Sequence, residues 1–283
     1  MPRFTDKVAI ITGSSFGIGR ETALLFAKEG ASVTVTGRNP QRLQDTKQAL
    51  LGAGIPESQF LIIPADITSS ESQDLLISKT IEKFGKLNIL VNNAGASIPD
   101  SEGRKGILQG LDTYDKDMEL NVKSVIALTQ KCRDHLIATK GEIVNVSSIV
   151  ALPAAYTGIP YYSVAKAALD QYSRASAISL IADGVRVNSV NPGFVATGFH
   201  EVECNAPEGA GKAFYESVGK EPSVIPCGFA GRATDIANVI AYLADRTVSA
   251  YIVGQNIVAD GGTTLVLGVH GHFNRLEKEA QRI

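Results

Sequence analysis

The chain has 283 residues, of which 44% are hydrophobic, so it can bury a substantial core without disulfide or metal staples. Its formal charge of -2 argues against nucleic acid or an anionic membrane surface as a partner. The three cysteines are widely spaced, and the four histidines lack ligand spacing, so we expect no disulfide framework and no metal site. No apolar run near the start matches a signal sequence or a membrane span, and we expect a soluble, cytoplasmic protein.

Short β-branched runs alternate with longer stretches of helical periodicity, which predicts parallel strands joined by right-handed helical crossovers and therefore an α/β fold. The expected strands are 8–12, 32–36, 60–64, 89–92, 142–147, 186–191 and 255–258. The expected helices are 18–29, 40–51, 70–84, 114–138, 163–182 and 235–243.

Regular patterning fails between residues 198 and 231, where only residues 212–218 keep a helical period. Such an excursion from a compact domain usually covers a binding site, so we expect it to cover the substrate. After residue 262 a tail, residues 263–283, ends in a charged segment that is expected to be a solvated helix or a frayed end. No low-complexity linker divides residues 1–283, and a single domain is expected.

A glycine-rich loop, Thr12-Gly13-Ser14-Ser15-Phe16-Gly17-Ile18-Gly19, lies between the first strand and its helix. Missing side chains allow a sharp turn and a close approach to a pyrophosphate, which the helix N-terminus attracts. A plain tight turn is the alternative, but the strand-to-helix setting favours a dinucleotide site. The expected contacts are Gly13, Ser14, Ser15, Gly17, Ile18 and Gly19.

The choice of cofactor is read at the end of the second strand, where an acidic residue would bind the ribose 2′-OH and repel a 2′-phosphate. The chain has Thr36-Gly37-Arg38-Asn39 here, with no acid and with an arginine that can pair with a phosphate. NADP(H) is therefore expected rather than NAD(H), with contacts from Arg38 and Asn39. A simple surface arginine is the alternative interpretation.

Further motifs follow in chain order, and together they resemble those of the short-chain dehydrogenase/reductase family over residues 7–262. They are the loop 12–19, Asp66, Asn92-Asn93-Ala94-Gly95, Asn121, Ser148, Tyr162-x-x-x-Lys166, Asn191-Pro192-Gly193 and Asp260-Gly261-Gly262. The resemblance implies a doubly wound, mostly parallel sheet of the Rossmann type, with helices on both faces. It also implies a nicotinamide cofactor across the carboxyl ends of the strands and hydride transfer to or from a carbon that bears oxygen.

Tyr162 is the expected acid/base, because Lys166 lies four residues on and shares its helix face, whereas Tyr161 is displaced by more than a quarter turn. Bringing a phenol from a pKa of about 10 to about 7 requires roughly 4 kcal/mol of phenolate stabilisation. Lys166, an oxidised nicotinamide and exclusion of water could supply it together. A core tyrosine beside a snorkelling lysine is the alternative.

The resemblance implies roles for other residues. Ser148, rather than Ser147, would orient the carbonyl oxygen, although strand alternation alone does not choose between them and either could be a turn former. Asn121 would distort its helix and complete a proton relay through a water near Lys166, a plain exposed asparagine being the alternative. The remaining cofactor contacts that it implies are Asp66, Ile67, Asn93, Ala94, Gly95, Tyr162, Lys166, Pro192, Gly193, Val195 and Thr197.

For Asp66 a helix cap is a fair rival to contact with the adenine. The substrate is expected to be a neutral, partly apolar ketone or secondary alcohol, and tropinone-type alicyclic ketones, steroids, sugars and acyl ketones all remain open. Its expected walls are Ile98, residues 153–160 and, from the excursion, His200, Val202, Cys204, Phe214, Tyr215 and Val218. A carbonyl reductase that forms a homotetramer or homodimer is expected. The alternatives are a catalytically silent dinucleotide sensor or scaffold, and an epimerase or dehydratase on the same fold.

Overall fold

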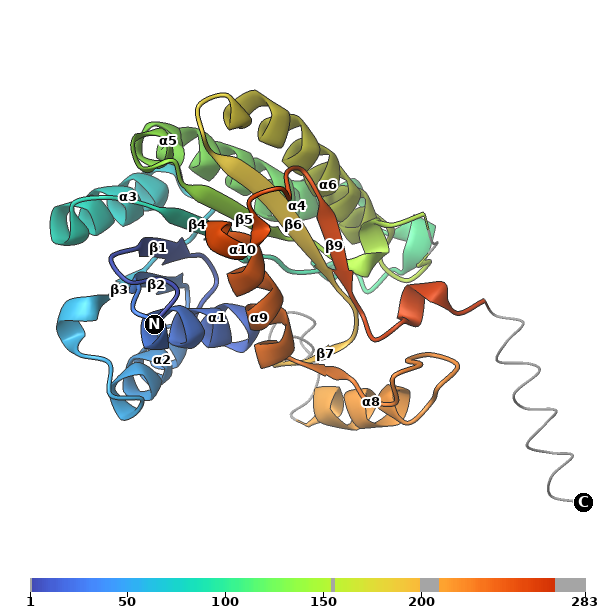
Figure 1. Cartoon of the computed structure of the whole chain (residues 1–283). Coiled ribbons are helices and arrows are strands. Elements are labelled where there is room, and N and C mark those ends of the chain that lie inside the picture. Colours follow the sequence, from blue (N-terminus) through green and yellow to red (C-terminus); the bar gives the residue numbers. More distant parts are fainter. Residues whose placement is uncertain (1, 154–155, 199–208, 268–283) are drawn as a thin grey trace, which may run out of the picture.

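The computed structural model describes residues 2–153, 156–198 and 209–267. A seven-stranded parallel sheet runs through the centre, with helices on both faces (Figure 1). Its strands are β1 (Val8–Ile11), β2 (Ser32–Gly37), β3 (Phe60–Pro64), β4 (Ile89–Asn92), β5 (Glu142–Val146), β6 (Arg186–Pro192) and β9 (Asn256–Ala259). The order in the sheet is β3-β2-β1-β4-β5-β6-β9, so the expected doubly wound α/β fold is confirmed.

The helices lie between the strands in the chain. They are α1 (Gly17–Lys28), α2 (Pro40–Gly52), α3 (Ser70–Phe84), α4 (Leu111–Met118), α5 (Ser124–Thr139), α6 (Pro160–Ile181), α8 (Ala210–Gly219), α9 (Ala233–Ala244) and α10 (Arg246–Ser249). A π-helical turn, η3 (Glu119–Lys123), joins α4 to α5. Short 3-10 turns are η1 (Glu57–Gln59), η2 (Gly106–Leu108), η4 (Ile149–Ala151) and η5 (Thr263–Leu265).

Two apolar cores sandwich the sheet, because strands buried on both faces send alternate side chains to opposite sides. In β1, Ala9 and Ile11 join the core under α1, α2 and α9, whereas Ile10 joins the core under α3, α5 and α6. Local signals end the helices: Ser69 caps α3 by accepting from the Ser72 amide, and Gly85 ends it at a φ of 76°. The strands are therefore fixed on both sides, and their carboxyl ends form one rigid edge.

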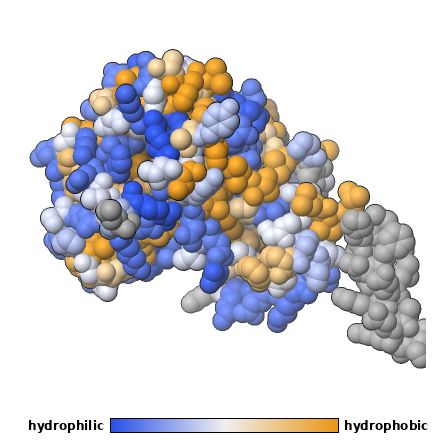
Figure 2. Space-filling view, in the orientation of Figure 1, coloured by the Kyte–Doolittle hydropathy of each residue, from blue (hydrophilic) through white to orange (hydrophobic). Residues whose placement is uncertain are grey.

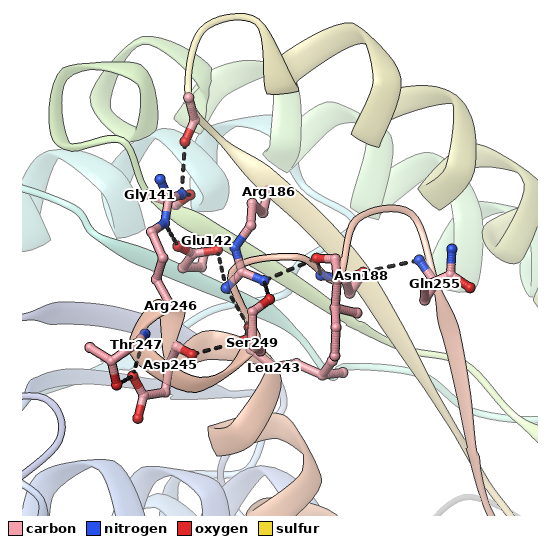
Figure 3. A network of polar contacts seen from close by, with 12 residues as sticks. Gly141, Glu142, Arg186, Asn188, Leu243, Asp245, Arg246, Thr247, Ser249 and Gln255 are labelled. Carbon is pink, nitrogen blue, oxygen red and sulfur yellow. Dashed lines mark hydrogen bonds and ion pairs between the residues drawn. The ribbon is translucent and has the colours of Figure 1, made fainter.

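A buried polar network holds the opposite edge of the sheet, where β5 and β6 begin (Figure 3). Arg186 forms an ion pair with Glu142 at 2.8 Å, and it donates hydrogen bonds to the carbonyl oxygens of Leu243 and Ser249. Arg246 contacts the other oxygen of Glu142 at 2.6 Å. These contacts attach the end of α9 and the start of α10 to the sheet. They lie where β5 and β6 begin, at the edge opposite the carboxyl ends of the strands.

Two short strands, β7 (Val195–Ala196) and β8 (Gly231–Arg232), pair in parallel beside the main sheet. Val195 pairs with Gly231, and Ala196 with Arg232. The predicted excursion thus leaves and rejoins the domain through a two-residue ladder, and its described part contains α8. Residues 199–208 and 268–283, including most of the expected tail and its charged end, lie outside the described residues.

Candidate active site

A cavity of about 380 Å³ opens at the carboxyl edge of the sheet. Each of the strands β1 to β6 brings residues to it, because parallel strands end at the same edge. The predicted site residues that line it are Gly13, Ser15, Gly17, Ile18, Arg38, Asp66, Ile67, Asn93, Ala94, Gly95, Ser148, Tyr162, Lys166, Pro192, Gly193, Val195 and Thr197. Segments that are far apart in the sequence therefore meet around one cavity.

Four predicted site residues do not line the cavity. The Ser14 hydroxyl, beneath the loop, donates to the Ile11 carbonyl at 2.6 Å and accepts from the Thr36 amide. Gly19 packs against the loop, where an added Cβ would lie 2.4 Å from Asn93 Nδ2. Asn39 caps α2, and Asn121 is fully buried behind the cavity. Ser14, Gly19 and Asn121 therefore contact the lining segments from behind, whereas Asn39 is an exposed helix cap.

The glycine-rich loop is shaped by the segment that follows β4. Gly13 has a φ of 62°, and an added Cβ would lie 2.8 Å from the Ala94 Cα, so only glycine fits without a backbone shift. The Asn93 amide nitrogen donates to the carbonyl oxygens of Thr12 and Gly13 at 2.9 and 3.0 Å. This brings the loop backbone and the N-terminus of α1 to the cavity, an arrangement that fits the pyrophosphate of a dinucleotide.

At the far end of the loop, Arg38 and Asp66 line the part of the cavity next to β2 and β3. Burial alone would raise the pKa of Asp66, but hydrogen bonds from Thr68 and the charge of Arg38 outweigh it and lower that pKa. Asp66 accepts from the Thr68 amide at 3.0 Å, whereas Ser69 caps α3. The predicted rival role of Asp66 as the cap of that helix is therefore not observed.

The paired serines and the paired tyrosines differ in burial or in hydrogen-bond partners. Both serines line the cavity, but Ser147 is buried and its hydroxyl donates to the Lys166 carbonyl, whereas Ser148 is half-buried and accepts from the Val150 amide. Tyr161 donates to the Gln109 carbonyl at 3.0 Å and does not line the cavity, whereas Tyr162 does. Of the two tyrosines only Tyr162 therefore reaches the cavity, whereas both serines reach it and Ser148 is the more exposed of them.

Lys166 is almost fully buried next to Tyr162. Its Nζ donates to the Val146 carbonyl at 3.0 Å and lies 5.6 Å from the centre of the Tyr162 ring. Burial lowers the pKa of Lys166 to about 8, against the opposing charges of Asp170 and Asp117. A lysine so placed is still largely protonated at neutral pH, and its positive charge favours the phenolate form of Tyr162.

Asn121 lies in the π-helical turn η3 and is 0% exposed, so the alternative of a plain exposed asparagine is wrong. Its amide accepts from the Ala96 amide at 3.2 Å and donates to the Ala96 carbonyl at 2.8 Å. An added Cβ on Gly95 would lie 2.8 Å from Asn121 Oδ1 and 3.0 Å from Lys166 Nζ. Asn121 and Lys166 therefore flank the same small space behind the cavity.

Apolar and aromatic side chains wall the outer part of the cavity. Phe194 packs edge-on against Phe214 at 5.8 Å, and Phe214 against Tyr215 at 5.5 Å. Of the predicted walls, Phe214, Tyr215 and Ile159 line the cavity, whereas Ile98, Pro153, Pro160 and Val218 do not, and His200, Val202 and Cys204 lie outside the described residues. Tyr156, from the predicted range 153–160, lines the cavity as well. Lining residues that the sequence analysis missed include Phe16, Ser97, Leu120, Ile149, Val150 and Phe194.

Among the described residues, no cluster of His, Cys, Asp or Glu could hold a metal ion, and no helix is long and apolar enough to cross a membrane. The site that the described residues form is the carboxyl edge of a parallel sheet, which carries a glycine-rich loop and a Tyr–Lys pair. These features define the class of nicotinamide-dependent oxidoreductases.

Comparison with known proteins supports the assignment to this class of oxidoreductases. Residues 13–264 match a family profile described as enoyl-(acyl carrier protein) reductase. Dehydrogenase/reductase SDR family member 4 of Caenorhabditis elegans is 34% identical over 261 residues, which are 92% of this chain and 96% of that protein. A short-chain dehydrogenase/reductase of unknown function from the same organism, crystallised with cofactor, is 53% identical, with a TM-score of 0.94 over 96% of this chain and 100% of that chain.

The crystal structure of a glucose dehydrogenase of C. elegans in the apo form is 49% identical, with a TM-score of 0.81 over 93% of this chain and 100% of that one. The chain therefore belongs to the short-chain dehydrogenase/reductase family. It is an oxidoreductase that acts on CH–OH groups, or on the corresponding carbonyl, with a nicotinamide cofactor.

Proposed function

We propose that the chain is an NADP(H)-dependent carbonyl reductase or alcohol dehydrogenase in which Tyr162 is the acid/base. One observation carries this proposal: Tyr162, Lys166 and Ser148 meet at the cavity that the glycine-rich loop also lines. The residues fit the cofactor, since Gly13 and Gly17 of the loop after β1 line the cavity without a side chain where a pyrophosphate would approach. When bound, the nicotinamide supplies the hydride or accepts it.

In the reducing direction Tyr162 donates its phenolic proton to the carbonyl oxygen while the carbon gains the hydride, so the C=O bond becomes a C–OH group. The Ser148 hydroxyl donates a hydrogen bond to the same oxygen and orients it toward Tyr162. Lys166 stabilises the phenolate that remains. We propose that Asn121, behind Lys166, completes the path by which Tyr162 regains its proton from solvent. In the oxidising direction the same groups act in reverse.

The preference for NADP(H) is proposed from Arg38, which lines the cavity directly after β2. No acidic residue stands at the end of β2, so nothing there repels a 2′-phosphate, and the planar guanidinium can bind one in a bidentate manner. Asp66 lies on the next strand end and is already paired with Thr68. We propose that it contacts the adenine and not the ribose phosphate.

The proposed substrate is a neutral, partly apolar ketone or secondary alcohol of moderate size. The outer cavity presents rings and aliphatic side chains, among them Tyr156, Phe194 and Phe214. No lysine, arginine, aspartate or glutamate of the described residues lines this outer part, which disfavours a polyanionic substrate. We propose that the excursion, residues 198–231, covers this end of the cavity.

We also propose a homodimer or homotetramer. Exposed apolar side chains lie on α6, where Ile178 is 72% exposed, and beyond the free edge of β9, where Leu265 is 81% exposed. Figure 2 shows an apolar band across the face on which Figure 1 places β9 and the turn after it. Patches of this kind usually mark contacts between subunits. The free cysteines Cys132 and Cys227 support a reducing, cytoplasmic location.

The test is oxidation of NADPH and NADH with a panel of alicyclic ketones, steroids, sugars and acyl ketones. Tyr162→Phe is compared with Tyr161→Phe, a matched control whose hydroxyl lies outside the cavity. We expect Tyr162→Phe to lose at least about 100-fold in kcat/KM and Tyr161→Phe to stay near wild type. Equal losses in both variants would refute the role of Tyr162. Tight NADPH binding without turnover of any panel member would favour a catalytically silent sensor.

A further inference from the structure

Asp117 is a buried carboxylate one helical turn before Asn121, and the acid–base mechanism above does not use it. Its side chain is 1% exposed. Its Oδ1 accepts from the Ile98 amide at 3.2 Å and lies 3.4 Å from the Asn121 amide nitrogen, which also donates to the Asp117 carbonyl at 3.0 Å. Asp117 therefore holds both the Asn121 side chain and the start of the segment that follows β4.

Asp117 also acts on Lys166 through its charge. Helices α4 and α6, which carry the two residues, pack against each other. Asn121 contacts Asp117 on one side and, across Gly95, approaches Lys166 Nζ on the other. The negative charge of Asp117 raises the pKa of Lys166, and the positive charge of Lys166 lowers that of Asp117. The two groups thus attract each other across the Asn121 amide.

Few other charges face this pair among the described residues. On α6 they are Asp170, whose carboxylate accepts from Asn191, and the phenol of Tyr162. On α4 and η3, Asp112 pairs with Lys116 and Glu119 with Lys123 at the surface, and Asp115 is exposed. In the segment after β4, Asp100 pairs with Arg104, and β5 offers Lys166 the Val146 carbonyl. Asp117 and Asp170 are therefore the buried negative charges that compensate Lys166.

We propose that Asp117 is a positioning residue of the acid–base site, which holds the Asn121 amide and compensates the buried ammonium of Lys166. This inference rests on the proposed function of Tyr162 and Lys166. Burial raises the pKa of Asp117 to about 6 and lowers that of Lys166 to about 8, so both groups are charged between these values. Within this window the attraction between the two charges supports the protonated state of the site.

The direction of the pH shift that results from removing the Asp117 charge does not depend on whether Tyr162 or Lys166 loses its proton first. Tyr162 and Lys166 lose protons as a coupled pair, and a neighbouring negative charge makes each loss harder. Removing that charge makes the loss easier, so the apparent pKa of the pair falls. In Asp117→Asn we expect the alkaline limb of the pH profile of kcat/KM for reduction, and the acidic limb of the profile for oxidation, to move to lower pH by about one unit.

The experiment compares Asp117→Asn with the same change at Asp115, which is exposed two residues away on the same helix. Asp117→Thr, whose hydroxyl can still accept from Ile98, is the second neutral variant if the asparagine does not fold. The tyrosinate absorbance of Tyr162, taken as the difference from Tyr162→Phe, is titrated without any substrate. This second measurement decides the role of Asp117 even if every ketone of the panel fails.

A shift to lower pH in both Asp117 variants, with none in Asp115→Asn, is the expected result. The proposal is overturned if the folded Asp117 variants titrate at the wild-type pH. It is equally overturned if Asp115→Asn shifts as much, because the effect would then come from net charge alone. If the tyrosinate absorbance of Tyr162 does not titrate in the wild type or in any variant, the proposed role of Tyr162 as the acid/base is refuted as well.

Discussion

Replacing Asp117 by asparagine should stabilise the fold at neutral pH, although the residue serves the site. Burial raises the pKa of this carboxyl from 3.8 to about 6, so the folded protein binds the proton more tightly than the unfolded chain does. The stability that this provides is present in full below pH 4 and is lost as pH rises through 6. Above pH 6 the wild type holds an ionised carboxylate that is worse solvated than in the unfolded chain.

The expected gain in free energy of unfolding follows from the size of the pKa shift of Asp117. Roughly two pKa units correspond to about 3 kcal/mol, which is the largest gain in free energy of unfolding that Asp117→Asn can give at pH 7. Asparagine keeps an oxygen that can accept from Ile98, so no buried donor is left without a partner. At pH 4 most wild-type molecules are already protonated at this position in the folded state, and the gain falls below about 1 kcal/mol.

Urea unfolding at pH 7 and at pH 4 measures both values, with Asp115→Asn as the exposed control. The reasoning requires a gain at pH 7 that shrinks on acidification, and no such trend in the control. An equal change in free energy at the two pH values would contradict it, because the effect would then be one of packing. A loss of stability at pH 7 would show that the favourable interactions of the Asp117 carboxylate outweigh the energetic cost of burying it.

Three further changes test other parts of the molecule. Arg38→Ser should raise the KM for NADPH at least about tenfold and leave that for NADH nearly unchanged; equal effects on both would exclude a contact with a 2′-phosphate. Gly95→Ala places a Cβ 2.8 Å from Asn121 Oδ1 and 3.0 Å from Lys166 Nζ, so we expect the drop in kcat to exceed the loss of NADPH affinity measured by fluorescence titration; a loss of affinity alone would contradict this. Arg186→Met removes one of the two ion-pair partners of the buried Glu142, leaving Arg246, and should lower the free energy of unfolding by about 3 kcal/mol in urea. A variant as stable as wild type would show that the network in Figure 3 contributes little.

Local signals in the sequence were sufficient for most of the fold. The predicted bounds of β3, α3 and β4 agree with the structure residue for residue, and Ser69 and Gly85 cap α3 as such residues do. The predicted helix 114–138 is in fact α4, the turn η3 and α5. Helical periodicity, which is read over several turns, does not resolve a single π turn inside a long helical segment. The predicted helix 163–182 begins earlier, at Pro160, where proline suits a first helical position.

The candidate site likewise contains residues that could be assigned from the sequence and residues that could not. Residues that lie next to a strand end, such as Gly13 and Arg38, could be assigned from the sequence because the fold brings all such ends together. The sequence could not choose between Ser147 and Ser148 without a resemblance, since the chain leaves regular strand geometry there. Phe214 and Tyr215 were predicted as walls, but Asp117 and Phe194 were missed, because nothing in a helical pattern or an irregular segment shows which side chains meet in space. Only tertiary packing supplies that information.

The two-residue ladder of β7 and β8 has a consequence for how such a chain can diverge. It ties residue 195 to residue 231, so the number and kind of residues between them can change without displacing the strands or Tyr162. The entropy of closing a loop grows only slowly with its length, and longer or shorter versions therefore differ little in stability. The ladder makes the segment an exchangeable module, and recombination at its two ends is a practical route to new pocket walls on unchanged catalytic machinery.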